Sequence, residues 1–188
     1  MSGRVERIGL ATLYLGDCRE IAPMLERPAA VISDPPYGLG DKLAGSAGGK
    51  WALHFGEGAP AWDKIRAEFV HSLPALADAC VIWGGNYYDL PAMRGWLIWD
   101  KIVREFTSGH CEMAWTTIDQ PIRAFSYSHG ALASEGKEHP TQKPVPLMRW
   151  CIDQAKVPAG GTILDPYMGS GTTLIAAEQL NRTCYGME

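Results

Sequence analysis

Several features that would place this 188-residue chain in a specialised class are missing from its sequence. No internal repeat and no Gly/Ser-rich linker divides it, so the length and globular composition favour one domain. The apolar runs are short and broken by Gly, Pro or Asp, which argues against a membrane span. The first ten residues, MSGRVERIGL, lack the long apolar core of a signal peptide.

Cysteine and histidine patterns also exclude some classes of site. The five cysteines (Cys18, Cys80, Cys111, Cys151 and Cys184) are widely spaced, and none forms a CxxC pair. This pattern favours reduced, mostly buried thiols in a cytosolic protein over disulfides or a zinc site. The five histidines form no HxxxH pair, so we expect no metal.

The chain also lacks an excess of basic residues. Its 21 acidic and 17 basic residues give a net charge of −4, which argues against a non-specific nucleic-acid coat protein. A local basic cleft is still compatible with this balance. The candidates for such a cleft are Lys42, Lys50, Lys101, Arg104, Arg123, Lys137 and Lys143.

Short apolar runs alternate with helical or loop segments along the chain. Strands are expected at 11–17, 29–34, 80–85, 96–100, 112–117, 161–165 and 183–188. Helices are expected at 18–26, 63–79, 144–157 and 172–180. Asp63 is expected to cap the second helix, Pro74 to kink or split it, and Asn181 to be a C-cap of the last. This alternation predicts an α/β fold with a mostly parallel sheet.

Acidic residues follow several of these strands. Asp17, Asp34, Asp165 and Glu188 each stand where an expected strand ends. Ligands of parallel sheets bind beyond the carboxyl ends of the strands, so we expect these acids at one edge. For the stretch DPPYG (34–38) an ordinary turn is the alternative, because Asp, Pro and Gly all favour turns.

The stretch ILDPYMGSGTT (163–173) joins an expected strand to a helix through a glycine-rich turn. It lacks the lysine of a P-loop and the third glycine of a dinucleotide site. S-adenosylmethionine is the third nucleotide-like ligand compatible with such a turn. An oxidoreductase or NTPase that uses this turn is the rival interpretation.

Three motifs together resemble the amino-DNA methyltransferases, which modify exocyclic amines of adenine or cytosine. They are DPPY (34–37), HPTQKP (139–144) and DPYMGSGTT (165–173). Their order resembles the permuted β class. The resemblance implies a Rossmann-like, circularly permuted methyltransferase fold, with seven mostly parallel strands and an antiparallel last strand. Residues 1–188 would then form one catalytic domain, with a long loop at 39–62 after the catalytic motif.

The resemblance also implies roles for individual residues. Asp34, Pro35, Pro36 and Tyr37 would be catalytic: Asp34 and the Pro35 carbonyl accept hydrogen bonds from the target amine, and Tyr37 stacks on the flipped base. The residues expected to bind S-adenosylmethionine are Asp17, Cys18, Asp34, Thr141, Gln142, Lys143, Asp165, Tyr167, Gly169, Ser170, Gly171, Thr172, Thr173 and Glu188. Lys143 would meet the cofactor carboxylate, and helix N-capping is the alternative for the two threonines.

The implied substrate is double-stranded DNA. Adenine-N6 is favoured over cytosine-N4, because in this family the motif DPPY is more typical of adenine methylation and SPPY of cytosine methylation. A catalytically silent cofactor- or DNA-binding module is the other alternative. Residues 118–138 are too few for a separate target-recognition domain. Recognition therefore comes from a short segment, from the 39–62 loop or from the second subunit of a homodimer. The resemblance implies a cytoplasmic protein of bacterial or phage origin, for which restriction–modification, phage self-protection and regulation all fit as settings.

Overall fold

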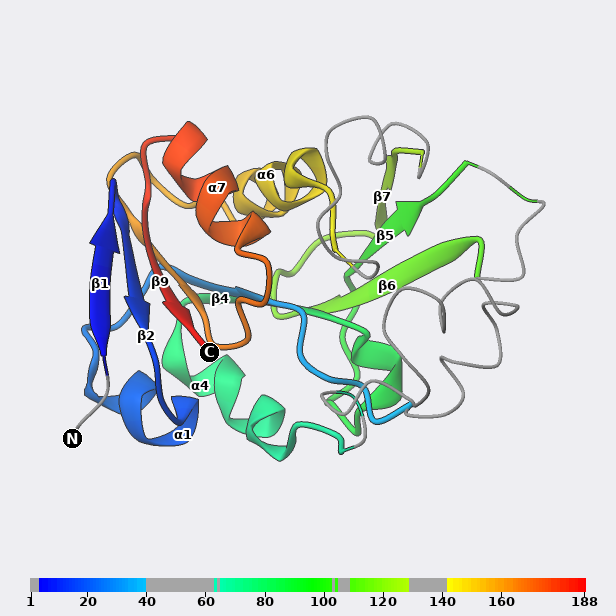
Figure 1. Cartoon of the computed structure of the whole chain (residues 1–188). Coiled ribbons are helices and arrows are strands. Elements are labelled where there is room, and N and C mark those ends of the chain that lie inside the picture. The colour runs from blue at the N-terminus through cyan, green and yellow to red at the C-terminus, as the bar shows by residue number, and fades with distance from the viewer. Residues whose placement is uncertain (1–3, 40–62, 64, 103, 105–108, 129–141) are drawn as a thin grey trace, which may run out of the picture.

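The computed structural model describes residues 4–39, 63, 65–102, 104, 109–128 and 142–188. Every strand in these ranges belongs to one nine-stranded sheet of order β1-β2-β9-β8-β3-β4-β6-β5-β7 (Figure 1). Its strands are β1 Val5–Ile8, β2 Ala11–Tyr14, β3 Ala30–Ser33, β4 Ala79–Trp83, β5 Trp96–Asp100, β6 Cys111–Thr116, β7 Arg123–Ser126, β8 Thr162–Asp165 and β9 Thr183–Met187.

All seven expected strands are present, and the α/β fold class is confirmed. β6, the strand expected to be antiparallel, pairs antiparallel with both β4 and β5. The sequence did not reveal β1 and β7, which extend the sheet at its two edges. The backbone of β1 pairs with β2 alone, and all four of its residues are exposed, so no burial pattern marks it.

Helices pack against both faces of the sheet (Figure 1). On one face, α6 (Val145–Gln154) and α7 (Thr172–Gln179) share a core with the middle strands. On the other face lie α1 (Cys18–Ile21), η1 (Ala22–Met24), η3 (Glu68–Ser72) and α4 (Leu73–Leu76). A further short 3-10 helix, η4 (Gly85–Tyr87), follows β4.

The expected helix over 63–79 forms only in part. Among the described residues of this range, a 3-10 helix spans 68–72 and the α-helical residues are the four of α4, so the change of helix type falls next to Pro74. Pro74 lies in the first turn of α4, where its missing N–H has no intrahelical partner to lose. By contrast, Asn181 follows α7 at φ 55°, and the amides of Asn181 and Arg182 donate to Glu178 and Ala177, which closes the helix as expected.

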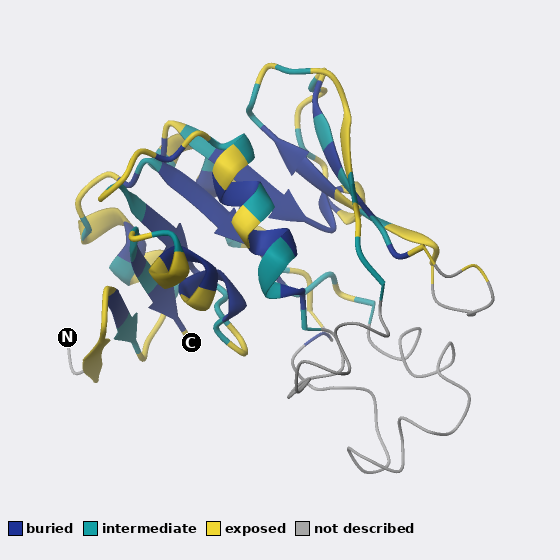
Figure 2. Ribbon diagram, turned by 90° about the horizontal axis from the view of Figure 1, so that it is seen from above, coloured by how far each residue is buried: buried dark blue, intermediate teal, exposed yellow. Residues whose placement is uncertain are grey.

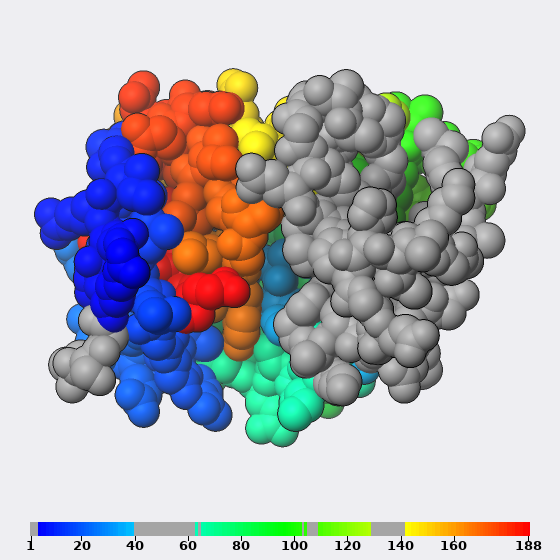
Figure 3. All heavy atoms as spheres, viewed as in Figure 1, coloured from blue at the N-terminus to red at the C-terminus, as the bar shows by residue number. Residues whose placement is uncertain are grey.

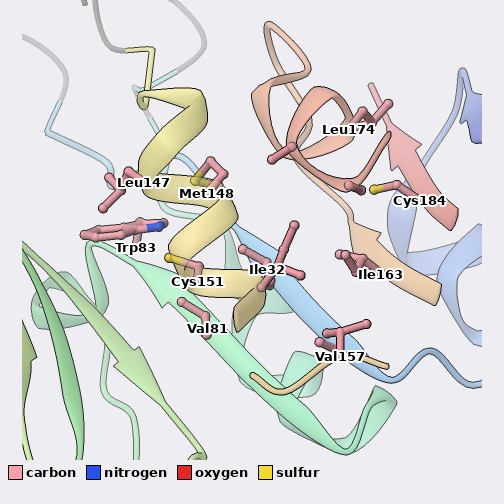
Figure 4. Packing of buried hydrophobic residues seen from close by; sticks show 14 of the residues in the cluster. Ile32, Val81, Trp83, Leu147, Met148, Cys151, Val157, Ile163, Leu174 and Cys184 are labelled. Atoms are coloured by element: carbon pink, nitrogen blue, oxygen red, sulfur yellow. The ribbon is translucent and has the colours of Figure 1, made fainter. Parts of the chain in front are cut away.

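The middle strands are apolar because both of their faces are covered. Ile32, Val81 and Ile163 lie under α6 and α7, together with Trp83 at the end of β4 (Figure 4). The three are fully buried, as are the central strands in Figure 2, whereas β1 is exposed. This packing makes β8, β3 and β4 a rigid base for the loops that follow them.

Two isoleucine-to-alanine substitutions, one buried and one exposed, test how tightly this core is packed. Ile163 is fully buried in β8, whereas Ile175 on α7 is 46% exposed. We expect Ile163→Ala to lower the free energy of unfolding by about 2–5 kcal/mol. The same change at Ile175 should alter it by less than about 0.5 kcal/mol. Urea unfolding measures both, and equal losses would contradict the packing described.

Candidate functional site

Four neighbouring parallel strands have their carboxyl-terminal ends on the same side of the sheet, which is called the strand-end edge. β2, β9, β8 and β3 are adjacent and mutually parallel. Asp17, Glu188, Asp165 and Asp34 therefore stand in a row, one at or just after each strand end. The three spacings between these strands total about 14 Å. This edge is long enough to hold an extended ligand across several strand ends.

Backbone hydrogen bonds join the loops along this edge. The Gly16 amide donates to the Glu188 carbonyl at 3.1 Å, and the Met168 amide donates to the Met187 carbonyl at 3.1 Å. Figure 3 shows the end of β9 (red) at the surface between segments from the beginning of the chain (blue) and the β8–α7 region (orange). Segments far apart in the sequence thus share one surface.

The carboxylate of Asp34 is held at both oxygens. Oδ1 accepts from the Tyr37 hydroxyl, and Oδ2 accepts from Lys143 Nζ at 2.6 Å. The side chain of Asp34 is 26% exposed, so it faces neither bulk water nor the hydrophobic core. This arrangement goes beyond an ordinary turn, because side chains 3 and 109 positions away hold the acid.

The ring of Tyr37 lies in an aromatic niche. It stacks on Tyr87 with 5.1 Å between ring centroids and 25° between planes. Gly84, at φ 65°, lies directly against this ring, and a Cβ on Gly84 would stand 2.1 Å from Cε1 of Tyr37. The niche therefore requires glycine at position 84 for both space and backbone conformation.

Asp63 stabilises the backbone after the DPPY motif instead of capping a helix. Its buried carboxylate accepts hydrogen bonds from the amides of Tyr37, Gly38 and Leu39, at 2.5, 3.1 and 2.9 Å. Three charge-assisted bonds to consecutive amides define the path of the chain beyond Tyr37. The sequence reads Asp63 as a helix cap because its true partners lie more than 20 positions earlier.

Lys143 is buried among acidic and aromatic groups. Only 4% of its side chain is exposed, and Nζ also contacts Glu112 Oε2 at 3.0 Å and the Tyr37 hydroxyl at 3.2 Å. Burial disfavours the ammonium, but the carboxylates of Asp34 and Glu112 outweigh it and hold the pKa of Lys143 above its usual value. Lys143 is thus a cation whose contacts among the described residues include Asp34 and Tyr37 of the DPPY motif.

Two members of the expected basic cleft are buried. Lys101 is 7% exposed and pairs with Glu112 at 2.7 Å, and Lys143 is buried as described. Of the others, Arg104 pairs with Asp100, Arg123 is exposed on β7, and Lys42, Lys50 and Lys137 lie outside the described residues. Buried lysines cannot attract a phosphate backbone, so Lys101 and Lys143 serve another purpose.

Asp165 is the buried acid of the row. It accepts from Ser33 Oγ at 2.7 Å and from the Tyr167 amide at 3.2 Å. Burial raises the pKa of Asp165 to about 6, against the opposing hydrogen bonds of Thr173 and Ser33. The Thr173 hydroxyl therefore bonds to Asp165, and no side chain caps α7 at Gly171.

The turn after Asp165 offers open backbone. Gly169 and Gly171 adopt φ values of 47° and 77°, and a Cβ on either would meet no atom within 4 Å. Ser170 is exposed between them, and Thr172 and Thr173 are buried at the start of α7. A ligand can approach this turn closely, so its shape fits the expected nucleotide-like cofactor.

The far end of the row combines a helix cap with a thiol. Asp17 caps α1 by accepting from the Arg19 amide at 2.9 Å, and the same side chain pairs with the Arg19 guanidinium. The Cys18 thiol lies beside the Tyr167 hydroxyl, and burial raises the pKa of both groups. Asp17 therefore has Arg19 as a structural partner. Cys18 links the start of α1 to the turn after β8 through its contact with Tyr167.

The remaining expected site residues take different positions. Pro35 is buried, and the Pro36 carbonyl accepts from the Tyr88 hydroxyl and from the Ala67 amide. Gln142 is half-buried next to Lys143, and Glu188 is exposed after β9. Thr141 and the aromatic residues of the 39–62 loop lie outside the described residues. Within the described ranges, no three acidic, histidine or cysteine side chains converge as metal ligands.

The sequence did not single out Glu112, Asp63 or Gly84 for this site. Glu112 did leave a signal, because it is the one acid in the expected strand EMAWTT, directly before the apolar run Met-Ala-Trp. The pKa of Glu112 is about 2: burial raises it, and Lys143 and Lys101 more than offset that effect. Neither lysine lies in β6 with Glu112, so the sequence alone does not show that they form ion pairs with it.

Two glycine variants test the Tyr37 niche. Gly84→Ala and Gly160→Ala both place alanine at positive φ, which costs about 1–2 kcal/mol. A Cβ at Gly160 meets nothing within 4 Å, whereas one at Gly84 meets the Tyr37 ring. We expect Gly84→Ala to lose about 1–3 kcal/mol more unfolding free energy. Equal losses in urea unfolding would show that the ring is not packed there.

Comparisons with known proteins agree with this geometry. The family model for DNA methylases matches residues 83–188, more than half of the chain. A stretch of 58 residues is 47% identical to the Type II methyltransferase M.HindIII of Haemophilus influenzae, covering 30% of this chain and 18% of that protein. The matched stretch is thus under a fifth of that relative's length.

Solved structures share the fold over nearly the whole chain. The crystal structure of the M1.HpyAVI-SAM complex superposes with a TM-score of 0.59 at 20% identity, covering 95% of this chain and 92% of that one. The PvuII DNA methyltransferase, cytosine-N4-specific, gives 0.58 at 16% identity, covering 95% and 81%. By its family match and its motifs, the chain belongs to the DNA methylase family, the amino-DNA methyltransferases.

Proposed function

We propose that this chain transfers a methyl group from S-adenosylmethionine to the N6 amine of an adenine flipped out of double-stranded DNA. The observation that carries the proposal is the Asp34 carboxylate, held beside the row of strand ends that includes Asp165 and the glycine turn. The cofactor supplies a methyl group on a sulfonium, which is already electrophilic. The protein must therefore position the amine and accept its hydrogen bonds.

Asp34 and its neighbours suit that task. An exocyclic amine is a weak nucleophile, because its lone pair is delocalised into the ring. A carboxylate that accepts an amine N–H localises the lone pair on nitrogen, and the Pro35 carbonyl offers a second acceptor on a rigid backbone. Tyr37 supplies an aromatic face next to Asp34 on which a flipped base stacks.

The other strand ends suit the cofactor. Asp165 and the open turn at Gly169 and Gly171 would hold the methionine end, because the carboxylate accepts from its ammonium. Glu188 would accept from the ribose hydroxyls, and Asp17 with Cys18 would border the adenine. Lys143, expected from the motif to meet the cofactor carboxylate, has protein partners for all three of its N–H donors, Asp34 among them, so we assign it to the catalytic motif instead.

We further infer that residues 1–188 act as one catalytic domain, because every described strand belongs to one sheet. β7 lies in the segment 118–138, which we propose contributes to recognising DNA together with the loop 39–62 or a second subunit. Among the described residues, no helix is both long and apolar enough to cross a bilayer.

Product analysis tests the proposal. Unmethylated, mixed-sequence duplex DNA is incubated with the chain and isotope-labelled S-adenosylmethionine, then digested and analysed as nucleosides by mass spectrometry. We expect labelled N6-methyladenine. Labelled N4-methylcytosine would overturn the choice of base, and the absence of any labelled nucleoside would favour a catalytically silent module.

Asp34→Ala tests the acceptor. We expect the rate of methyl transfer to fall by about 10²–10³-fold, the usual effect of removing one preorganised group at a reacting centre. Affinity for S-adenosylhomocysteine, measured by calorimetry, should stay within about twofold, because the pocket for the methionine end is intact. Asp78→Asn, at an exposed ion pair with Arg27, is the control and should match the parent. An unchanged rate in Asp34→Ala would contradict the assignment.

The raised pKa of Asp165 predicts pH-dependent cofactor binding. Below about 6 the buried group is protonated, and it then no longer offers a full negative charge to the ligand ammonium. Affinity for S-adenosylhomocysteine should therefore be about tenfold weaker at pH 5 than at pH 7. Asp165→Asn should bind more weakly and show no such dependence. If parent and variant share one pH profile, Asp165 does not meet the ammonium.

A further inference from the structure

A line of four alternating charges runs from the β5–β6 pair to the catalytic motif. Lys101 Nζ lies 2.7 Å from Glu112 Oε1, Glu112 Oε2 lies 3.0 Å from Lys143 Nζ, and Lys143 Nζ lies 2.6 Å from Asp34 Oδ2. Two cations and two anions sum to zero charge. Lys101 follows β5, Glu112 lies in β6, Asp34 follows β3 and Lys143 precedes α6, so no single motif contains the line.

The ammonium of Lys143 is the centre of this line. Its three N–H donors match three oxygens within 3.2 Å, those of Asp34, Glu112 and Tyr37. Nζ also lies over the rings of Tyr37 and Trp83, 5.7 and 5.9 Å from their centroids. An ammonium with 4% side-chain exposure has little access to water, so these partners decide where it sits.

Glu112 is the second carboxylate in contact with Lys143 Nζ, besides Asp34. With Glu112 present, Nζ is shared between two carboxylates, and its pull on Asp34 is divided. Without Glu112, the whole charge would fall on Asp34, which would weaken that carboxylate as an acceptor. Lys101 in turn pairs with the second oxygen of Glu112, so the side chain is held at both oxygens.

We propose that Glu112, held by Lys101, is a positioning residue for methyl transfer: it anchors Lys143 Nζ so that Lys143 fixes Oδ2 of Asp34. Oδ1 of Asp34 accepts from the Tyr37 hydroxyl and keeps a second lone pair with which to accept from the target amine. The inference rests on the proposed function of Asp34. Glu112 itself touches neither base nor cofactor in this scheme, and it acts only through Lys143.

The charged and titratable neighbours of Lys143 give the variant a distinct signature. The described groups that face it are Asp34, Tyr37 and Glu112, with the buried Cys151 thiol of α6 nearby. Burial lowers the pKa of Lys143, and Asp34 and Glu112 together raise it above its usual value. Removing the Glu112 charge leaves burial opposed by one carboxylate, so the pKa of Lys143 should fall.

Glu112→Gln tests the proposal on the full chain with unmethylated duplex DNA. We expect kcat to fall about tenfold or more, with the KM for S-adenosylmethionine within about twofold. The alkaline limb of the kcat profile should move to lower pH, because Lys143 loses its proton sooner. Glu112→Asp keeps the charge and should restore the alkaline limb.

The matched control is Glu178→Gln on α7. Glu178 is exposed and accepts from the Leu10 amide at 2.6 Å, at the other end of α7 from the glycine turn. It should keep the parental kcat and pH profile. A Glu112→Gln protein with parental kcat and profile would overturn the inference, as would one that loses only thermal stability.

A second measurement separates this inference from the proposed function. If the parent chain transfers no methyl group, the proposed function fails on its own. The Lys143 Nζ resonance, identified by its loss in Lys143→Arg, is then followed with pH by NMR in parent and Glu112→Gln. A lower titration point in the variant supports the coupling of Glu112 to Lys143, and identical titrations overturn it.

Discussion

The ammonium of Lys143, buried between the carboxylates of Asp34 and Glu112, is the interaction on which the site depends. A buried cation is tolerated only where charges and oxygens surround it, and here they come from β3, from β6 and from Tyr37. Satisfying this one group therefore brings together a strand end, an antiparallel strand and the segment before α6. Asp34 is held in place as a consequence.

The sheet order turns that local arrangement into a continuous site. β3, β8, β9 and β2 stand side by side, although β3 and β8 are separated by more than 120 positions in the chain. The acids of the row then follow each other in space from Asp34 to Asp17. A base at one end and a cofactor across the rest is the division of space that this order favours, with Ser33 linking Asp34 to Asp165.

Much of this was predictable from the sequence, and the failures have physical causes. Buried strands such as β3 and β8 show as apolar runs, and the motif acids Asp34 and Asp165 stand at their ends. The edge strand β1 left no pattern, because its side chains are exposed and its backbone pairs with only one neighbour. The roles of Glu112 and Asp63 could not be predicted, because their partners are distant in sequence. An acid that precedes apolar residues at helical spacing commonly caps a helix, so the sequence predicts that role for Asp63.

The most direct measurement is a crystal structure of the chain with S-adenosylhomocysteine. The account predicts that the ligand sulfur lies between the Asp34 carboxylate and the turn at Gly169, with the adenine toward Asp17. A ligand seated at the opposite edge of the sheet, or one whose sulfur is separated from Asp34 by the body of the protein, would contradict the account.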